Sequence, residues 1–514
     1  MSHLSRREFL KTTGRVSLGA GILGAPHISR AANRKPNLLF LWTDEQRADT
    51  IDVYGNATIQ TPNMSRLAQE SIVFKRAYIS QPVCTPSRST VMTGLWPHES
   101  GCTTNNIPLP DTTPCLPEIL GDSDYRTGYF GKWHLGDEIF AQHGFEEWVS
   151  MEDGYRPYYR ESRDKTQKSS YYHFLKDLGY APDTDQGDFS RGFASHLKIE
   201  HCKPKFLELS ACDFLRRHKS EPFILYVNFL EPHMPFFGPL NDLHSPDEIS
   251  LPANFDDPLE EDEPLAYRLK QLHYRERGYG DLDLKTEAGW RRLIANYWGL
   301  CSQVDQSVGE ILKTLEAEGL ADNTIVVYTS DHGDMMGSHR LLAKTVMYEE
   351  SARVPWMMRI PQSGFKSQVI SQPVSHIDMV PTLLDLMGKP MEDRFTGHSL
   401  VPLMKGGFAR EDHVFIEWNP SSAKDSMENP SESLNCIDPE RRTRALKSHT
   451  RTVIPPSGWK LCLNDQDSDQ LFNLNLDPGE TQNLYYTGMY NKRIEELSKR
   501  IRQWQRRVGD RIGV

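Results

Sequence analysis

Short apolar runs that end in charged residues recur along the first two thirds of the chain. Residues 36–42 lead directly into Thr43, Asp44 and Glu45, and residues 323–329 repeat the pattern before Asp331. A short apolar run bounded by polar residues is typical of a strand buried on both faces of a parallel sheet. Ligands of open α/β sheets bind beyond the carboxyl ends of such strands. The pattern therefore predicts a parallel sheet with acidic pairs at its carboxyl edge.

Beyond about residue 400 the pattern changes to short alternating segments separated by polar or Pro/Gly-containing stretches. We predict short antiparallel strands over residues 413–418, 451–454, 459–463 and 470–474. A long polar loop is expected over residues 419–442, and an amphipathic helix packed on the domain from about 492 to 507. These elements indicate a main domain over residues 32–400 and a smaller C-terminal subdomain over 401–514.

Length and charge narrow the class of protein. A chain of 514 residues is long enough for one large α/β domain plus an appendage. The formal net charge of −11 argues against nucleic acid as a partner. An anionic substrate is still compatible with it, because local cations decide such binding. No run of eighteen apolar residues follows the N-terminal segment, so we expect no integral membrane span.

The first residues read as an export signal. The segment 5–11 (SRREFLK) resembles the twin-arginine consensus, with a mildly apolar stretch over 16–25 and small residues around Ala31. We expect a signal peptide over residues 1–31, recognised by the twin-arginine translocase of a bacterium. Its five Lys or Arg and one Glu mean that removal takes the net charge from −11 to −15. The mature protein is expected in the periplasm or outside the cell.

The segment Cys84-Thr85-Pro86-Ser87-Arg88 places a thiol at the predicted start of a helix. Pro86 suits the first helical position, because it lacks an N–H and has its φ angle already set. Arg88 lies one turn after Cys84, on the same face. Since a helix N-terminus attracts anions, about one helical turn combines a thiol, a guanidinium and an anion-binding end.

This segment resembles the signature of the type I sulfatases, in the alkaline phosphatase superfamily. The resemblance implies that a formylglycine-generating enzyme oxidises Cys84 to formylglycine. One hydroxyl of the hydrated aldehyde would attack sulfur, and the other would expel sulfate by re-forming the aldehyde, which a bare thiol cannot do. Arg88 and Lys132 would orient and ionise this diol. The motifs run in family order from Pro36 to Leu484.

The family also implies a fold. It is an alkaline-phosphatase-like α/β sandwich with a large mixed, mostly parallel sheet flanked by helices. A smaller C-terminal α+β subdomain contains a short antiparallel sheet.

The acidic pairs resemble the two halves of the sulfatase metal site. The resemblance implies that Asp44, Glu45, Asp331 and His332, together with Cys84, hold one divalent ion, with calcium favoured and Mn²⁺ or Mg²⁺ possible. Carboxylates from two strand ends suit a hard cation, which would neutralise the substrate oxyanion and help to ionise the attacking hydroxyl.

The acidic pairs Asp44-Glu45 and Asp331-His332 both depart from the pattern that is common among sulfatases. The Asp-His pair looks like the choline sulfatase and phosphonate monoester hydrolase branch, and its imidazole suits manganese better than calcium. The extra methylene of Glu45 could carry its carboxylate off the metal. Asp334 is expected to be a solvated loop carboxylate.

Four cationic or titratable residues lie in further sulfatase-like motifs. Lys132 and His134 occupy alternate positions of Gly-Lys-Trp-His, which would place both on one face of an extended segment. His233 lies in Pro-His-x-Pro, and Lys344 precedes Tyr-Glu-Glu-Ser. The match implies that these four residues grip the sulfate and that one histidine protonates the leaving oxygen. The expected pocket rim consists of Arg47, His98, Asn105 and Asn106, of which Asn106 is a candidate substrate-binding residue.

The remaining cysteines leave the disulfide pairing open. Of eight cysteines, seven remain once Cys84 is set aside, so at least one stays free within the chain. Cys102 and Cys115 are near enough in sequence to bridge, but spacing alone does not establish a bond.

The sequence thus predicts a sulfuric ester hydrolase, and sulfatases of this kind usually act on polysaccharide or glycosaminoglycan fragments. One alternative is a phosphonate or phosphate ester hydrolase on the same scaffold, favoured by the Asp331-His332 pair. A second alternative is an inactive lectin that binds sulfated glycans, against which the intact motif set argues.

Overall fold

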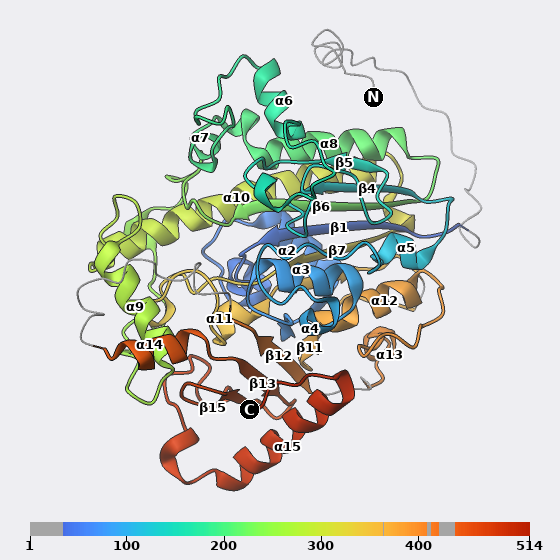
Figure 1. Cartoon of the computed structure of the whole chain (residues 1–514). Coiled ribbons are helices and arrows are strands. Elements are labelled where there is room, and N and C mark those ends of the chain that lie inside the picture. Colours follow the sequence, from blue (N-terminus) through green and yellow to red (C-terminus); the bar gives the residue numbers. More distant parts are fainter. Residues whose placement is uncertain (1–33, 363, 409–412, 421–436) are drawn as a thin grey trace.

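The computed structural model describes residues 34–362, 364–408, 413–420 and 437–514 (Figure 1). The predicted signal peptide lies outside these residues. Eight strands form the main sheet, in the order β10-β2-β9-β7-β1-β6-β4-β5. Their bounds are Gln368–Ile370, Ile72–Phe74, Trp356–Arg359, Thr324–Ser330, Asn37–Asp44, Phe223–Pro232, Arg126–Gly131 and Glu147–Val149. All neighbouring pairs are parallel except those of β9, which is antiparallel to both of its neighbours.

The two apolar runs predicted as buried strands are β1 and β7, at the centre of this sheet. Both are buried along their whole length, which explains why their sequences are continuous rather than alternating. Thr43 pairs with Ser330 in parallel register, and Asp44 lies opposite Pro232 after an irregularity in β1. Residues that follow β1, β6 and β7 therefore meet at one edge of the sheet.

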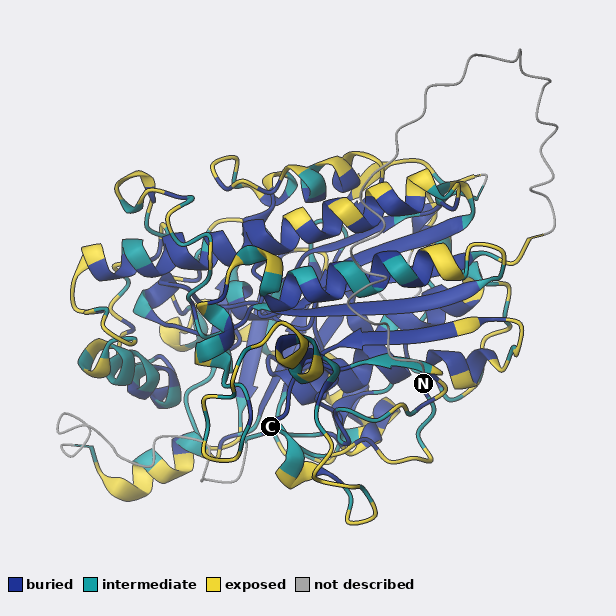
Figure 2. Ribbon diagram, turned by 90° about the horizontal axis from the view of Figure 1, so that it is seen from above, coloured by how far each residue is buried: buried dark blue, intermediate teal, exposed yellow. Residues whose placement is uncertain are grey.

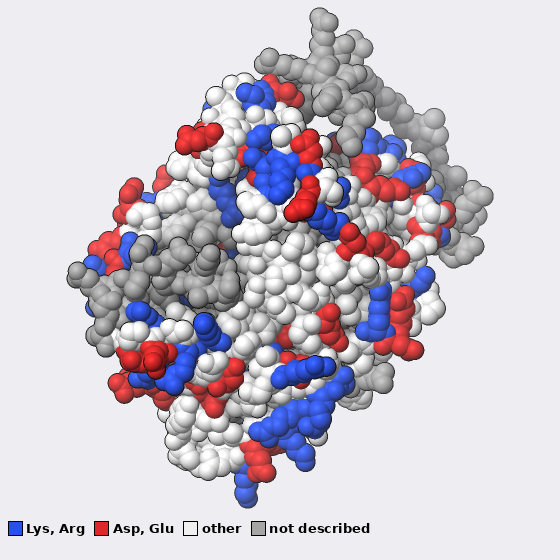
Figure 3. Space-filling model, viewed as in Figure 1, with Lys and Arg blue, Asp and Glu red and all other residues white. Residues whose placement is uncertain are grey.

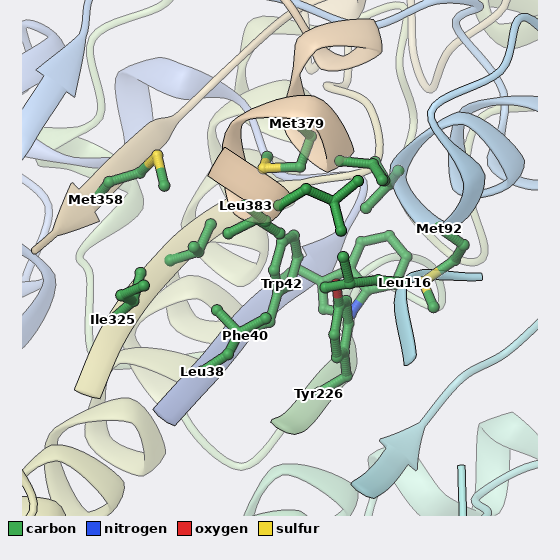
Figure 4. Packing of buried hydrophobic residues seen from close by; sticks show 14 of the residues in the cluster. Leu38, Phe40, Trp42, Met92, Leu116, Tyr226, Ile325, Met358, Met379 and Leu383 are labelled. Carbon is green, nitrogen blue, oxygen red and sulfur yellow. The ribbon is translucent and has the colours of Figure 1, made fainter. Parts of the chain in front are cut away.

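Helices cover both faces of the main sheet. In Figure 2 the strands, and the sides of the helices that face them, are dark blue because their residues are buried. On one face, Leu38, Phe40 and Trp42 pack with side chains of α3, α5 and α12 (Figure 4). These helices span Cys84–Thr93, Leu116–Leu120 and Met379–Leu386. On the other face, Leu39 and Leu41 pack against α2, α8 and α10. These helices span Pro62–Gln69, Lys203–Arg217 and Glu287–Ala317.

A second, four-stranded antiparallel sheet lies in the C-terminal part, in the order β12-β13-β14-β15. Its strands span Val414–Trp418, Thr450–Ile454, Trp459–Asn464 and Gln470–Asn473, close to the predicted segments. The helix α15 (Asn491–Val508) packs on this sheet through Leu497, Ile501 and Trp504. Its Lys and Arg residues gather on the outer surface (Figure 3). The predicted fold class is confirmed, whereas the boundary near residue 400 stays a prediction.

Smaller elements complete the fold. Strands β11 (Val374–Ser375), β3 (Ala77–Tyr78) and β8 (Arg353–Val354) form a three-stranded sheet. The remaining α-helices span Pro97–Ser100 (α4), Ser170–Asp177 (α6), Arg191–Ser195 (α7), Leu265–Arg277 (α9), Glu349–Ala352 (α11), Val401–Met404 (α13) and Pro439–Leu446 (α14).

The structure tests three predictions, on the polar loop, the cysteines and membrane-spanning helices. The loop predicted over 419–442 is wrong at its end, because Asp438 accepts a hydrogen bond from the Arg441 N–H and caps α14 there. All seven cysteines in the described part of the chain are free and buried, so Cys102 and Cys115 are not bridged. Among the described helices, none is both long and apolar enough to cross a bilayer.

Candidate active site

The acidic residues after β1 and β7 meet at the carboxyl edge of the main sheet. Asp44 ends β1, and Asp331 follows β7 directly, with its N–H donating to the Thr43 carbonyl at 3.1 Å. The Glu45 N–H donates to Asp331 Oδ1 at 3.1 Å. Both aspartates are fully buried. The parallel register of the two strands thus creates the acidic site that the sequence predicts.

Cys84 lies at the first position of α3, beside these carboxylates. Its Sγ is 3.2 Å from His332 Nε2 and 3.7 Å from Asp44 Oδ1. Burial, reinforced by Asp44, raises the pKa of the Cys84 thiol to about 11. The unmodified side chain is therefore a neutral thiol rather than an activated thiolate. Pro86 is the third residue of the helix and not the first, because the helix begins at Cys84 itself.

Arg88 joins the two aspartates from within the protein. Its Nη2 lies 2.7 Å from Asp44 Oδ2, and its Nε lies 2.8 Å from Asp331 Oδ2. Its Nη1 donates to the Lys132 carbonyl and to Asn228 Oδ1, both at 2.8 Å. The guanidinium is fully buried. Arg88 therefore holds the two acidic side chains in position and is itself held by the Lys132 carbonyl and Asn228.

Lys132 and His134 reach the site by a different route from the one predicted. The strand β4 ends at Gly131, and His134 has a left-handed backbone with φ of 56°. The segment is thus not extended, and the predicted alternation is wrong. Lys132 Nζ contacts Asp44 Oδ2 and lies 4.0 Å from Cys84 Sγ. His134 Nε2 lies 2.9 Å from Asn106 Oδ1.

Lys344 and His233 both approach Glu45. Lys344 Nζ lies 2.9 Å from Glu45 Oε2, and His233 Nε2 lies 3.3 Å from the same oxygen. Burial raises the pKa of Glu45 to about 8 although Lys344 opposes this shift. Burial, together with Lys344, holds the pKa of His233 well below its usual range. The imidazole of His233 is therefore neutral at physiological pH.

The donor atoms of the site fit a divalent cation. Oxygen, nitrogen and sulfur atoms of Asp44, Cys84, Asp331 and His332 lie within 4.8 Å of one another, and Asp44 forms a second such group with Glu45 and His233. Burial would raise the pKa of Asp44, but the cations Lys132 and Arg88 hold it well below its usual range. Glu45 Oε1 is buried without a hydrogen-bond partner. An ionised carboxylate beside an unpartnered carboxylate oxygen suits a hard cation.

Asp334 is buried, so the expectation of a solvated loop carboxylate is wrong. Its Oδ1 accepts from the Met336 N–H at 2.7 Å and from the Ala343 N–H at 3.1 Å. The two ends of the segment that leads to Lys344 are thereby tied together. Burial raises the pKa of Asp334.

A cleft of about 480 Å³ is lined by Lys344 and by Val83, the residue before Cys84. Asn105 and Asn106 line it, as predicted for the rim. Arg47 and His98 do not. Arg47 pairs with Asp49 at 2.7 Å, and His98 Nδ1 lies 2.8 Å from Glu417 Oε2 on β12.

Sequence reasoning missed two kinds of residue in this region. Asn228 orients Arg88. It could have been found from the sequence, because it is the one amide side chain in the apolar strand β6. Lys270 and Tyr274 on α9 line the cleft. Nothing in their local sequence distinguishes them from other polar residues of an amphipathic helix.

Comparisons with known proteins agree with this geometry. The sulfatase family model matches residues 36–389. An N-acetylglucosamine-6-O-sulfatase of Bacteroides thetaiotaomicron is 27% identical, over 93% of this chain and 87% of that protein. A protein solved in complex with its substrate D-glucosamine-2-N,6-O-disulfate has a TM-score of 0.70 at 25% identity, covering 93% of this chain and 99% of the other.

A phosphonate monoester hydrolase from Silicibacter pomeroyi shares the fold. Its TM-score is 0.75 at 22% identity, covering 92% of this chain and 95% of the other. The family match spans the main sheet and every strand end that supplies the acidic site. The chain therefore belongs to the sulfatase family, within the alkaline phosphatase superfamily.

Proposed function

We propose that this sulfatase releases sulfate from a sulfated saccharide, using formylglycine made from Cys84 and one divalent cation. The observation that carries the proposal is the position of Cys84 Sγ, 3.2 Å from His332 and 3.7 Å from Asp44 at the start of a helix. The names of the relatives support a saccharide, since one acts on N-acetylglucosamine 6-O-sulfate groups and another on a glucosamine disulfate.

The side chains around Cys84 divide into two roles. Lys132, His134, His233 and Lys344, with Asn106, would bind the sulfate oxygens. Preorganised cations in a site closed to water stabilise developing negative charge. Burial holds the pKa of His134 and of His233 well below its usual range, so both imidazoles are neutral without substrate. The one that protonates the leaving oxygen would first have to gain a proton, which the negative charge of a bound sulfate ester would favour. Arg88 would keep Asp44 and Asp331 in position.

Asp44, Asp331 and His332 would hold the cation, with Glu45 beside them. Bound there, the cation would supply Lewis-acid stabilisation of a sulfate oxygen. Calcium is the first candidate because most of the ligands are oxygens, and His332 makes Mn²⁺ the second. Removing metal with a chelator and restoring activity with Ca²⁺, Mn²⁺ or Mg²⁺ in turn would identify the ion.

A phosphonate monoester hydrolase is the second candidate function, favoured by the Asp331-His332 pair. The shared fold of the Silicibacter protein permits it. Turnover of nitrophenyl sulfate should exceed that of a phosphonate monoester by at least tenfold if the first proposal holds. The reverse order would favour the second.

Mass spectrometry of the peptide that contains residue 84 tests the nucleophile directly. Protein from a host with a formylglycine-generating enzyme should contain the aldehyde at position 84. Unmodified Cys84 in active protein would contradict the proposal. Unmodified Cys84 in inactive protein that still binds sulfated glycans would favour a lectin.

We also propose export to the periplasm by the twin-arginine route, on the basis of the sequence alone. Replacing Arg6 and Arg7 by Lys keeps the charge but removes the planar guanidinium donors that the receptor would read. The variant should accumulate inside the cell, uncleaved at Ala31, yet contain formylglycine and hydrolyse sulfate esters after lysis. Unchanged export would contradict this route.

A further inference from the structure

The cleft that Lys344 and Asn106 line is also lined by several elements outside the acidic site. They include α9, with Tyr267, Lys270 and Tyr274, and the residues after Lys344. Trp418 at the end of β12 and residues of α14, β13 and β14 line it as well, and α14 packs against α9. Its volume of about 480 Å³ is large enough for more than a sulfate group.

Lys270 is a half-buried cation in this cleft without a carboxylate partner. Its Nζ donates to the carbonyl of Lys344 and, at 3.0 Å, to Thr345 Oγ1. Within the described residues, no ion pair joins it to an acid. Lys132 and Lys344, by contrast, each contact a carboxylate. Because desolvating an unpaired ammonium is costly, a lysine left in this state beside a cleft is suited to an anionic ligand.

Among the described residues, Asp334 and Glu45 attract the charge of Lys270 only from beyond ion-pair distance. His273 lies on the same face of α9, three residues after Lys270, and its Nδ1 is buried without a hydrogen-bond partner. The one acid that lines the cleft is Asp467. Its two oxygens accept from the Leu265 N–H at 2.9 Å and the Ala266 N–H at 3.0 Å, at the start of α9. Asp467 therefore caps the helix rather than pairing with Lys270.

We propose that Lys270, with His273 beside it, binds a second anionic group on the same saccharide whose sulfate ester is hydrolysed at Cys84. This inference rests on the proposed function and specifies the substrate as a dianionic saccharide. The second group is a carboxylate or another sulfate, since both present oxygens to an ammonium. Aromatic side chains of Tyr274 and Trp418 line the same cleft and suit the apolar faces of a sugar ring.

If Lys270 only supported the backbone around Lys344, its removal would have a different effect on binding. Lys344 is flanked by Ala343 and Thr345, whose φ angles of 61° and 77° are left-handed. The contact from Lys270 to the Lys344 carbonyl therefore supports a strained turn. If support of this turn were its whole role, its removal would weaken binding of every substrate by the same factor.

Competition against nitrophenyl sulfate turnover separates the two roles. The competitors are glucosamine 6-sulfate, glucosamine 2-N,6-O-disulfate and a 6-sulfated disaccharide that contains a uronate. For Lys270→Met we expect the inhibition constant of at least one dianionic competitor to rise about 10–100-fold more than that of the 6-sulfate, the size of one charge-assisted hydrogen bond. Lys270→Arg should restore most of this preference. Arg275→Met, an exposed cation on the same helix, should leave it unchanged.

The competitor that responds identifies the second group as sulfate or carboxylate. An equal rise for all three competitors, or a wild type that binds monoanions and dianions equally well, would overturn the inference. Failure of the proposed function is a distinct result, because it would appear as wild-type protein that does not hydrolyse nitrophenyl sulfate.

Discussion

Arg88 and Lys460 are both fully buried cations, and each bridges two carboxylates. Arg88 does so at the edge of the main sheet, and Lys460 does so from the C-terminal sheet. Lys460 Nζ on β14 lies 3.1 Å from Glu349 Oε1 and 2.8 Å from Glu480 Oε1. We refer to Lys460, Glu349 and Glu480 as the Lys460 network. It joins α11, β14 and the segment after β15.

Each carboxylate oxygen of the Lys460 network contacts a protein group, although Glu480 Oε1 does so only through its ion pair with Lys460. Glu349 also lies 2.9 Å from the Tyr78 hydroxyl, which donates to it, and its N–H donates to Glu480 Oε2 at 2.6 Å. Burial raises the pKa of Glu480 to about 7 although Lys460 opposes this, so its negative charge is partly removed at neutral pH. Little charge is left to bind anything else.

The group around Arg88, by contrast, remains incomplete. Asp44 and Asp331 are held in place with donor atoms of Cys84 and His332 within 4.8 Å of them, and Glu45 Oε1 has no hydrogen-bond partner. The comparison teaches that a buried charge by itself does not mark an active site. The mark is a set of charges that the protein holds in position without completing their coordination.

The largest expected effect comes from the reactive centre. Cys84→Ala should lower sulfatase turnover by roughly 10⁴-fold or more, because it removes the nucleophile precursor. The temperature of unfolding should change little, since Arg88 and the carboxylates remain. Turnover of nitrophenyl sulfate and calorimetry on the same preparation measure both quantities. Residual activity above about a hundredth of wild type would contradict the assignment.

Lys344→Ala should come next, with a loss of roughly 10²-fold or more in rate, because it removes a charge-assisted contact to a developing oxyanion. Lys285→Ala is the matched control, since this lysine is exposed just before α10. Steady-state kinetics of both variants test the comparison. Equal small effects would mean that Lys344 is not part of the site.

The Lys460 network should affect stability instead of rate. Lys460→Met leaves two buried acids without their cation and should lower the free energy of unfolding by about 3 kcal/mol. Adding Glu480→Gln should recover part of this loss, because one uncompensated charge is then removed. Urea unfolding of the single and double variants measures the difference. A rate loss as large as that of Lys344→Ala would break the distinction between the two groups.

A smaller, pH-dependent effect is expected from a second contact with the C-terminal sheet. Burial opposes the charged form of His98, but Glu417 raises the pKa of this imidazole to about 8. The resulting stabilisation is fully present below pH 6.5 and is lost as the pH rises through 8. It amounts to about 2 kcal/mol. Urea unfolding at pH 6 and pH 9 should show this loss in wild type and a smaller one in His98→Gln.

Much of the site could be predicted because its signals are local. Apolar runs ending in Asp44 and before Asp331 determine buried parallel strands, and such strands place their following residues at one edge of the sheet. The Cys84–Arg88 segment defines a helix start within five residues. Local signals were not sufficient at His134. Its motif predicted an extended segment, whereas its backbone is left-handed.

By itself, then, the sequence determined the strands, the helix that begins at Cys84 and the family. Only the tertiary structure decided which charges are paired. Asp334 is buried near Glu45 and Arg47, His98 meets Glu417 across 319 positions, and Lys270 meets the Lys344 carbonyl across 74. The physical reason is that strand formation follows from neighbouring side chains, whereas the pairing of a charge depends on which distant segments the fold brings within a few ångströms of it.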